Sequence, residues 1–326
     1  MQAPLHAPCL KGRSTVGFGV TNASDEANTL DESRTPFVTK LYWPRRDRPK
    51  EEETIERARG VAKYLPDHLA FVVGSCDIDP LGTLCIKREL GTDTNSPSPP
   101  RARRMIIFER LIPITDLGGD TFLVALVQIM RCHFVLWNHG LGHQDISLAN
   151  LMARFKDGCY YGVLNDWDLA RTDADYPRKD LTGTMPFVAL RLLTVHVGSI
   201  NPGVKRLYYH ELESFFWIMI WVFLAYQDKK LQLTRNADRW QTGDPMRSLE
   251  VRNVFLAFQG LYRPNEEWKS YWEMSIAATR WVFSRCWDLN QEETVEGNLK
   301  SLQSFLEIVG QALMDQMPTT PLINVV

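Results

Sequence analysis

The chain has 326 residues, of which 44% are hydrophobic and 23% are charged, so it is long enough to bury the core of one large domain or of a two-lobed one. Its formal net charge of −2 gives no overall basic signature of the kind that nucleic-acid-binding proteins carry. The six cysteines lie far apart without a C-x-x-C pair, which argues against a zinc ribbon and a disulfide framework.

The apolar segments do not indicate export or membrane insertion. Residues 1–10 contain no apolar stretch of the kind found in secretory signals. The longest apolar run, Phe215 to Tyr226, is shorter than the roughly 18 to 20 residues that a membrane-spanning helix needs, so we expect a helix buried on all sides. The sequence therefore predicts a soluble intracellular protein, cytoplasmic or nuclear, with reduced thiols.

The first elements are expected to be strands. Glycines at positions 12, 17 and 19 would let backbone amides between Gly12 and Val20 approach a phosphate, although an ordinary Gly-rich turn before a strand explains them equally well. Residues 37–43 predict a strand that places Lys40 among apolar neighbours. A buried lysine is costly without a partner, so Lys40 either pairs with a carboxylate or extends its ammonium group to the surface.

A helix is predicted after Pro49, because proline favours the first helical turn. Its inward face would carry positions 51, 55, 58 and 62, which makes Glu51 the favoured ion-pair partner of Lys40. Glu52 and Glu53 remain alternatives. At least two of the three glutamates would simply be solvated at a helix start, where negative charge is favourable.

The next stretch predicts short strands and a long loop. Residues 69–74 and 84–88 are strand candidates, and the Ser- and Pro-rich residues 91–103 are expected to form a solvated loop, with binding to an SH3-like partner as a less favoured alternative. Residues 105–108 predict a buried strand. The segment from Glu109 to Pro113 would follow it as a hinge between lobes.

A long amphipathic helix is predicted from Asp120 to Gly140. His133 and His139 flank its apolar face without metal-ligand partners at suitable spacing, so we interpret both as structural. The apolar face is expected to be core, and its residues recur at helical spacing: Leu123, Leu126, Val127, Met130, Phe134 and Trp137.

The strongest functional pattern lies in residues 142–170. Asp145 and Asp166 are two acidic centres with Asn150 between them, and two apolar runs predict a hairpin that turns at residues 156–158. Phosphoryl transfer needs little covalent chemistry from a protein. It needs a carboxylate near the acceptor hydroxyl and oxygen ligands for magnesium, which these residue types supply.

The spacing of these residues is also informative. His143 and Asp145, with Asn150 five residues after the aspartate, have the spacing of a kinase catalytic loop. Asp166 and Asp168 stand where such chains carry the D-F-G motif. A solvated loop with chance Asp and Asn residues is the alternative, which the order and spacing of the two motifs disfavour.

At these residues the chain resembles the fungal-type protein kinases, which carry H-x-D-I-S-x-x-N-x-M and then G-x-L-x-D-x-D-L-A. Residues 182–187, T-G-T-M-P-F, are similar to the family's T-G-T-x-x-F. Residues 210–216, H-E-L-E-S-F-F, are similar to its H-D-L-E-S-F-F. The resemblance extends from about Gly12 to Phe305, and its most specific motifs lie in the second part of the chain.

The resemblance implies an α+β, two-lobed protein kinase-like fold. Residues 1–112 would form a small antiparallel sheet with one helix, and residues 113–326 a larger, mainly helical lobe with the catalytic and activation loops. The implied cofactors are ATP and Mg²⁺, and the implied partner is a protein substrate. No nucleic acid or membrane partner is indicated, and the oligomeric state is left open.

The resemblance also implies roles for the residues of the catalytic segment. Asp145 would orient and deprotonate the acceptor hydroxyl, and Thr184 resembles the threonine that contacts this aspartate in serine/threonine kinases. Asn150 and Asp166 would hold magnesium, with Asp168 as an additional carboxylate. A strand geometry would send the side chains of Asp166 and Asp168 to the same side.

The nucleotide contacts that the resemblance implies lie in the first part of the chain. Lys40 would hold the phosphates of ATP and pair with Glu51. The backbone between Gly12 and Val20 would cover the phosphates, and backbone groups of Glu109 and Leu111 would meet the adenine.

Several positions depart from the kinase pattern. Gln144 replaces the arginine of H-R-D, which removes the cation that usually pairs with a phosphorylated activation loop, so control by that phosphorylation is not expected. Arg191 replaces the glutamate of A-P-E. Glu211 replaces the helix aspartate that braces the catalytic loop, which puts the bracing of this lobe in question.

The sequence therefore predicts an ATP- and magnesium-dependent serine/threonine protein kinase. The degenerate Gly loop, Arg191 and Glu211 favour an alternative, a pseudokinase that serves as a nucleotide-binding interaction platform. A small-molecule phosphotransferase is less favoured because of the T-G-T-x-x-F and H-E-L-E-S-F-F segments.

Overall fold

The computed structural model describes residues 15–20, 36–79, 101–171, 181–198, 205–286 and 293–310. The chain divides into two compact units: a first unit of Met1–Gly60 with Leu69–Leu111, and a second unit of Val61–His68 with Ile112–Val326. Gly12, the strand candidate at residues 84–88 and residues 91–100 of the predicted loop lie outside the described residues.

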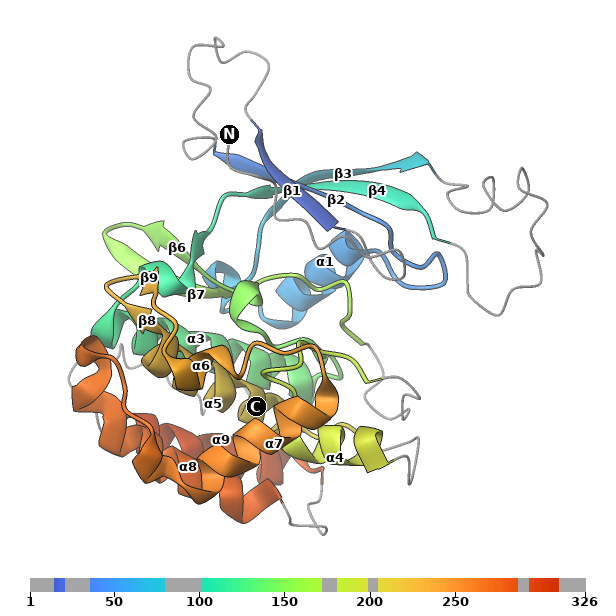
Figure 1. Cartoon of the computed structure of the whole chain (residues 1–326). Coiled ribbons are helices and arrows are strands. Elements are labelled where there is room, and N and C mark those ends of the chain that lie inside the picture. Colours follow the sequence, from blue (N-terminus) through green and yellow to red (C-terminus); the bar gives the residue numbers. More distant parts are fainter. Residues whose placement is uncertain are drawn as a thin grey trace. The chain divides into compact units, whose positions relative to one another are not determined.

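The first unit contains a four-stranded antiparallel sheet and one helix (Figure 1). The strand order is β1-β2-β4-β3, and Lys40 lies opposite both Gly17 and Ile106. Side chains of β4 alternate between buried and half-buried, as the two faces of a strand require. The elements are β1 (Thr15–Val20), β2 (Phe37–Tyr42), α1 (Glu51–Val61), β3 (Val72–Asp79) and β4 (Arg103–Glu109).

These elements match most of the sequence predictions, and one strand is displaced. The predicted strands at 37–43 and 105–108 are β2 and β4, and the predicted helix after Pro49 is α1. The strand predicted at residues 69–74 begins only at Val72 and continues to Asp79. The polar half of β3 is stabilised by a tertiary partner, because Asp77 pairs with Arg104 of β4 at 2.6 Å.

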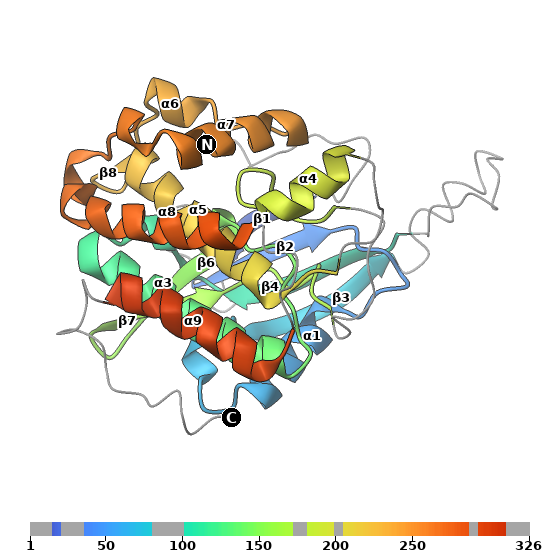
Figure 2. The ribbon, with the colours of Figure 1, turned by 90° about the horizontal axis from the view of Figure 1, so that it is seen from below.

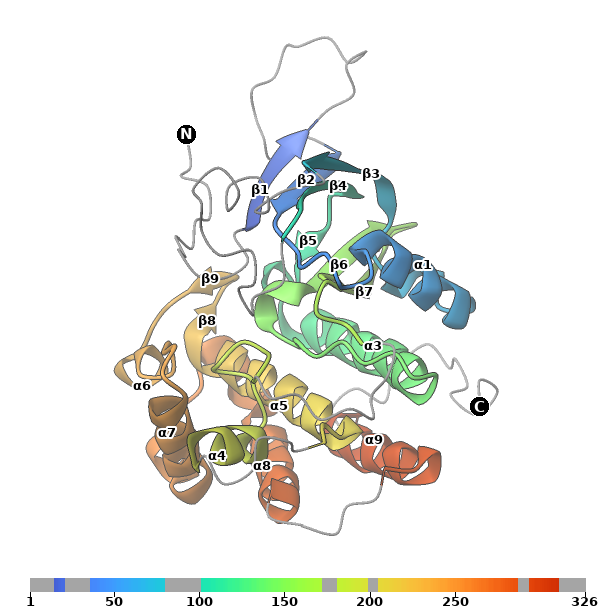
Figure 3. The same ribbon diagram turned by 90° about the vertical axis from the view of Figure 1, so that its right-hand side faces the viewer.

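The second unit is mainly helical and also contains small antiparallel sheets. Its helices α3, α5, α8 and α9 pack against one another (Figures 2 and 3). Strand β5 (Ile112–Pro113) pairs with β6, and the larger elements are α3 (Gly119–Asn138), β6 (Leu151–Lys156), β7 (Cys159–Leu164), α4 (Leu190–Gly198), α5 (Tyr208–Ala225), α7 (Pro245–Ala257), α8 (Trp272–Cys286) and α9 (Val295–Gly310). The shorter ones are the 3₁₀ turns Pro66–His68, Ile114–Asp116, Leu148–Asn150, Gln259–Leu261 and Glu266–Tyr271, strands β8 (Tyr226–Gln227) and β9 (Lys230–Leu231), and α6 (Arg235–Asp238).

Helix α5 is the centre of the second unit. All 18 of its residues are buried, and they include Phe215 to Ala225 of the apolar run that predicted a helix buried on all sides. Its surroundings are aromatic: the Trp217 ring packs edge-on against Trp240, and the Phe223 ring stacks on Trp268. The histidine and the two glutamates in its first turns, His210, Glu211 and Glu213, are buried with it and must find partners inside the fold.

Helix α3 coincides with the amphipathic helix predicted from Asp120 onward. It is also the one helix in the described part of the chain that is long and apolar enough to cross a membrane, judged by length and composition alone. Because 67% of that apolar window is buried inside the fold, against β7, α5 and α9, the apolar character of α3 is explained by core packing.

Strands β6 and β7 form the predicted hairpin. Their register runs from Leu151 opposite Leu164 to Lys156 opposite Cys159. The turn between them has Asp157 at φ 52° and Gly158 at φ 80°, both left-handed, as a two-residue hairpin turn with the native strand twist requires.

Candidate active site

The β6–β7 hairpin brings the two acidic motifs together, because one motif ends where β6 begins and the other starts where β7 ends. The backbone N–H of Asn165 donates to the carbonyl of Asn150 at 2.9 Å, one step beyond the last strand pair. His143 Nε2 donates to the carbonyl of Asn165 at 2.9 Å. These two hydrogen bonds hold both ends of the segment 143–150 against Asn165, the residue that precedes Asp166.

His143 is a structural member of this loop. Its Nε2 atom faces a carbonyl, which can only accept, so Nδ1 is unprotonated and accepts the N–H of Asp145 at 3.3 Å. Burial lowers the pKa of His143, which keeps the ring neutral and preserves this tautomer. His143 therefore orients the backbone of Asp145.

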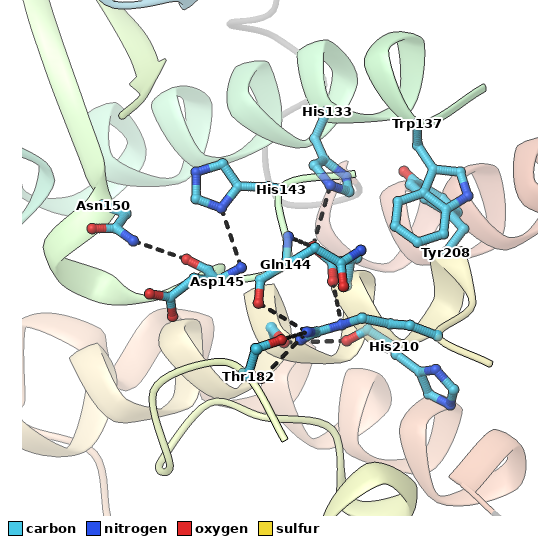
Figure 4. Close-up of polar contacts among 12 residues, drawn as sticks. His133, Trp137, His143, Gln144, Asp145, Asn150, Thr182, Tyr208 and His210 are labelled. Carbon is cyan, nitrogen blue, oxygen red and sulfur yellow. Dashed lines mark hydrogen bonds and ion pairs between the residues drawn. The ribbon is translucent and has the colours of Figure 1, made fainter. Parts of the chain in front are cut away.

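Asp145 is held at both its backbone and its carboxylate. Asn150 Nδ2 donates to the Asp145 carbonyl at 2.9 Å, and His143 and Asn150 approach Asp145 from either side (Figure 4). The Thr184 hydroxyl donates to Asp145 Oδ1 at 3.0 Å, as the resemblance to serine/threonine kinases implied. The carboxylate is half-buried and Thr184 is exposed, so an acceptor hydroxyl could reach this position.

Glu211 braces the catalytic loop even though it replaces an aspartate. Its Oε2 atom accepts the backbone N–H of Gln144 at 3.3 Å, and its Oε1 atom lies 2.6 Å from Arg206 Nε. Burial alone would raise the pKa of Glu211, but Arg206, together with His133 and His143, lowers it to about 2. The carboxylate therefore stays charged, and the doubt about bracing that the sequence raised does not hold at this position.

Glu213 holds the start of α4, close to the position at which Arg191 departs from the kinase pattern. Its Oε1 atom accepts the backbone N–H of Leu190 at 2.8 Å and Trp217 Nε1 at 2.9 Å. The hydroxyl of Tyr209 donates to Oε2 at 2.8 Å. A glutamate of α5 thus anchors this segment directly. Sequence reasoning missed Glu213 because nothing in the H-E-L-E-S-F-F motif says which backbone group the second glutamate meets.

The segment around Asp166 differs from the prediction. A strand geometry for Asp166 and Asp168 is wrong, because β7 ends at Leu164 and Asp166 is left-handed, with φ 61°. The turn inserts Trp167 into the core, where its Nε1 donates to the Leu164 carbonyl at 3.0 Å and its ring packs edge-on against His143.

The predicted metal ligands do not form a cluster of ionisable groups. Within the described ranges, no three His, Cys, Asp or Glu residues are grouped as a metal site. The set predicted from the sequence contains two carboxylates, Asp166 and Asp168, and the amide of Asn150. The side-chain nitrogen of Asn150 donates to the Asp145 carbonyl. The side-chain oxygen of Asn150 is therefore the atom that could bind a metal ion.

The first unit contains the predicted ion pair. Lys40 Nζ lies 2.7 Å from Glu51 Oε2, and both side chains are buried. The Lys40 ammonium also lies 4.6 Å from the centre of the Tyr42 ring. Of the alternative partners, Glu52 accepts the Ser75 hydroxyl, and Glu53 accepts the backbone N–H of Lys50 at the helix start.

The other predicted nucleotide contacts are only partly described. Gly12 lies outside the described residues, and Val20 is the half-buried last residue of β1. Glu109 ends β4, and its backbone N–H donates to the carbonyl of Phe71 at 3.2 Å. Leu111 is buried at the end of the first unit. Their predicted contacts with a nucleotide stay predictions.

The chain is similar to a known family over this region. The model of the fungal protein kinase family matches residues 101–223. The matched span contains the catalytic loop, the β6–β7 hairpin, the T-G-T-M-P-F segment and nearly all of α5. The match confirms the predicted resemblance and supports a kinase. No curated protein matches the chain.

Proposed function

We propose that the protein is a serine/threonine protein kinase that transfers the γ-phosphoryl group of ATP to a protein hydroxyl. The observation that carries the proposal is the geometry of Asp145, whose backbone is held by His143 and Asn150 and whose carboxylate accepts the hydroxyl of Thr184 at 3.0 Å. Phosphoryl transfer depends chiefly on such positioning of a carboxylate beside the acceptor.

We assign the other roles in the reaction to the residues of the kinase-like motifs. Asp145 accepts the proton of the acceptor hydroxyl, and Lys40 holds the phosphates of ATP. Asn150 and Asp166 supply the oxygen ligands that magnesium prefers, with Asp168 as a further carboxylate. Magnesium, when bound, neutralises charge on the phosphates. The pairing of Lys40 with Glu51 supports this assignment, because the carboxylate fixes the direction of the ammonium group.

The central test is Asp145→Asn. We expect a loss of transfer by roughly 100- to 10,000-fold, the range typical of a positioned base, with nearly unchanged ATP affinity because Asp145 does not hold the nucleotide. The assay uses labelled ATP, magnesium and a mixed peptide library. Asp157→Asn, the same change at the exposed hairpin turn, is the matched control. Unchanged turnover in Asp145→Asn would remove Asp145 from the mechanism.

A second measurement separates an active kinase from the alternative, a binding platform that has lost metal binding. We expect magnesium in the presence of ATP to raise the melting temperature, because a cation that binds only the folded state stabilises that state. Asp166→Asn should abolish this rise, and Asp168→Gly should reduce it only partly. A flat melting temperature up to about 10 mM magnesium, with ATP well above micromolar KM values, would favour the platform.

A further inference from the structure

Arg206, just before α5, joins three segments of the second unit with one side chain. Its Nε atom lies 2.6 Å from Glu211 Oε1 of α5. Its Nη1 atom donates to the carbonyl of Gln144 at 2.8 Å and to the carbonyl and hydroxyl of Thr182 at 3.3 and 3.2 Å. With 10% of its side chain exposed, Arg206 makes these contacts largely out of water.

The residue that these contacts hold has an unusual backbone. Gln144 is left-handed, with φ 70°, a conformation that costs energy for a residue with a side chain. Its backbone N–H donates to Glu211 and its backbone carbonyl accepts from Arg206, so the Arg206–Glu211 pair fixes both backbone polar groups of Gln144. The backbone conformation of Gln144 determines the position and direction of the next residue, Asp145.

The same arginine also fixes the segment that carries Thr184. Gly183 is left-handed, with φ 118°, and a Cβ atom there would lie 2.8 Å from Val188 Cγ2 and 3.7 Å from the Gln144 carbonyl oxygen. The positive φ favours glycine at this position, and an added Cβ atom would also crowd the Val188 side chain. Arg206 holds Thr182 on one side of Gly183, and Thr184 on the other side donates to Asp145.

Arginine is the residue type that suits this position. Its planar guanidinium presents several N–H donors in fixed directions, so it can bind a carboxylate and carbonyls at the same time, which a lysine ammonium does less well. The catalytic loop has no cation of its own at this point, because position 144 is glutamine. Glu211 remains charged beside Arg206, since its pKa is held near 2.

We propose that Arg206 is a positioning residue for phosphoryl transfer: it holds the left-handed Gln144 and the Thr182 segment together, so that Asp145 and Thr184 face each other. The catalytic part of this inference rests on the proposed kinase function. Arg206 does not touch the reacting groups in this role.

The test compares Arg206→Met with the wild type well below both melting temperatures. We expect kcat to fall by roughly 10- to 100-fold, as when a reacting group is slightly misplaced, while ATP affinity measured by direct binding stays within about twofold. Hydrogen exchange of the peptide covering residues 141–151 should become faster, because Glu211, which accepts the N–H of Gln144, loses the arginine that holds it in place. Wild-type kcat, or unchanged exchange in this peptide, would overturn the proposal.

Two further variants keep the test decisive. Arg263→Met removes an exposed arginine that also donates to carbonyls, those of Gly260 and Tyr262, and should change neither kcat nor exchange in residues 141–151. If Arg206→Met does not fold, Arg206→Lys is used instead, because it retains the positive charge beside Glu211 but lacks the planar guanidinium with its fixed N–H directions. For Arg206→Lys we expect roughly a tenfold loss of kcat. Full activity of Arg206→Lys would contradict the proposal.

Failure of the kinase assignment is distinguishable from failure of this inference. If wild-type protein transfers no phosphate, the proposed function fails, and the exchange of residues 141–151 in Arg206→Met against Arg263→Met still decides whether Arg206 holds the loop.

Discussion

Lys40 and Glu51 form an ion pair that is buried on both sides, so neither partner can be removed without consequence for the other. Breaking a buried pair leaves an unpaired charge, which costs more than the pair itself contributes. An effect of Lys40 substitutions on activity must therefore be separated from an effect on folding.

We expect Lys40→Met to lower the free energy of unfolding by about 3 kcal/mol, because Glu51 is left buried and charged. The double variant Lys40→Met with Glu51→Gln should recover much of that stability, since it buries no charge. Neither variant should transfer phosphate, because both lack the cation proposed to hold ATP. Urea unfolding gives the stability of each, and transfer by the double variant at the wild-type rate would show Lys40 to be a bystander.

Strand β7 and helix α3 pack so closely that their backbones are in contact. Gly162 of β7 makes this possible: a Cβ atom there would overlap the Ala125 carbonyl oxygen and lie 2.8 Å from Ile129 Cγ1. Its N–H donates to Gln128 Oε1, and its carbonyl faces His68 Nδ1 at 2.8 Å. The hairpin that closes the catalytic loop is thereby fixed to the long core helix.

We expect Gly162→Ala to lower the free energy of unfolding by about 3 kcal/mol or more, because the clash involves backbone and cannot be relieved by a rotamer change. Gly74→Ala is the matched control, a strand glycine with nothing within 4 Å of its added Cβ. Denaturant unfolding of both variants provides the comparison. Equal stability of the two would mean that the β7–α3 contact is looser than the structure indicates.

The buried polar residues at the start of α5 make the whole molecule sensitive to acid. Burial, together with nearby Arg206 and Arg191, lowers the pKa of His210 to about 3. Its neutral Nδ1 accepts the N–H of Leu207 at 2.9 Å, which caps the helix. In the unfolded chain a histidine has a pKa near 6.5, so between these values the unfolded state binds a proton that the folded state does not.

Stability should therefore fall as the pH falls from 6.5, and we expect His210 alone to contribute a loss of about 1 to 2 kcal/mol by pH 5. Glu211 contributes mainly below this pH range, because its pKa lies near 4.5 in the unfolded chain and is lowered further in the folded state. His210→Asn retains an acceptor for Leu207 and cannot titrate, so its unfolding free energy should depend less on pH. Parallel pH profiles for the two proteins would contradict this assignment.

The sequence by itself determined what depends on local periodicity and motif spacing. The apolar repeats located α3 and the apolar core of α5, the inward positions of α1 selected Glu51, and the hairpin signal placed Asn150 near the start of the second acidic motif. These features are set by interactions between residues close in the chain or by regular side-chain directions, which a linear pattern contains.

Only the tertiary structure decided which partners Arg206 and Glu213 find. Arg206 and Gln144 are 62 residues apart, and Glu213 and Leu190 are 23 apart, so no local pattern relates them. The left-handed turn at Asp166 and the burial of Trp167 next to it were likewise visible only in the fold. Because a buried charge or amide must find a partner wherever the fold brings one, such contacts follow from packing and not from spacing.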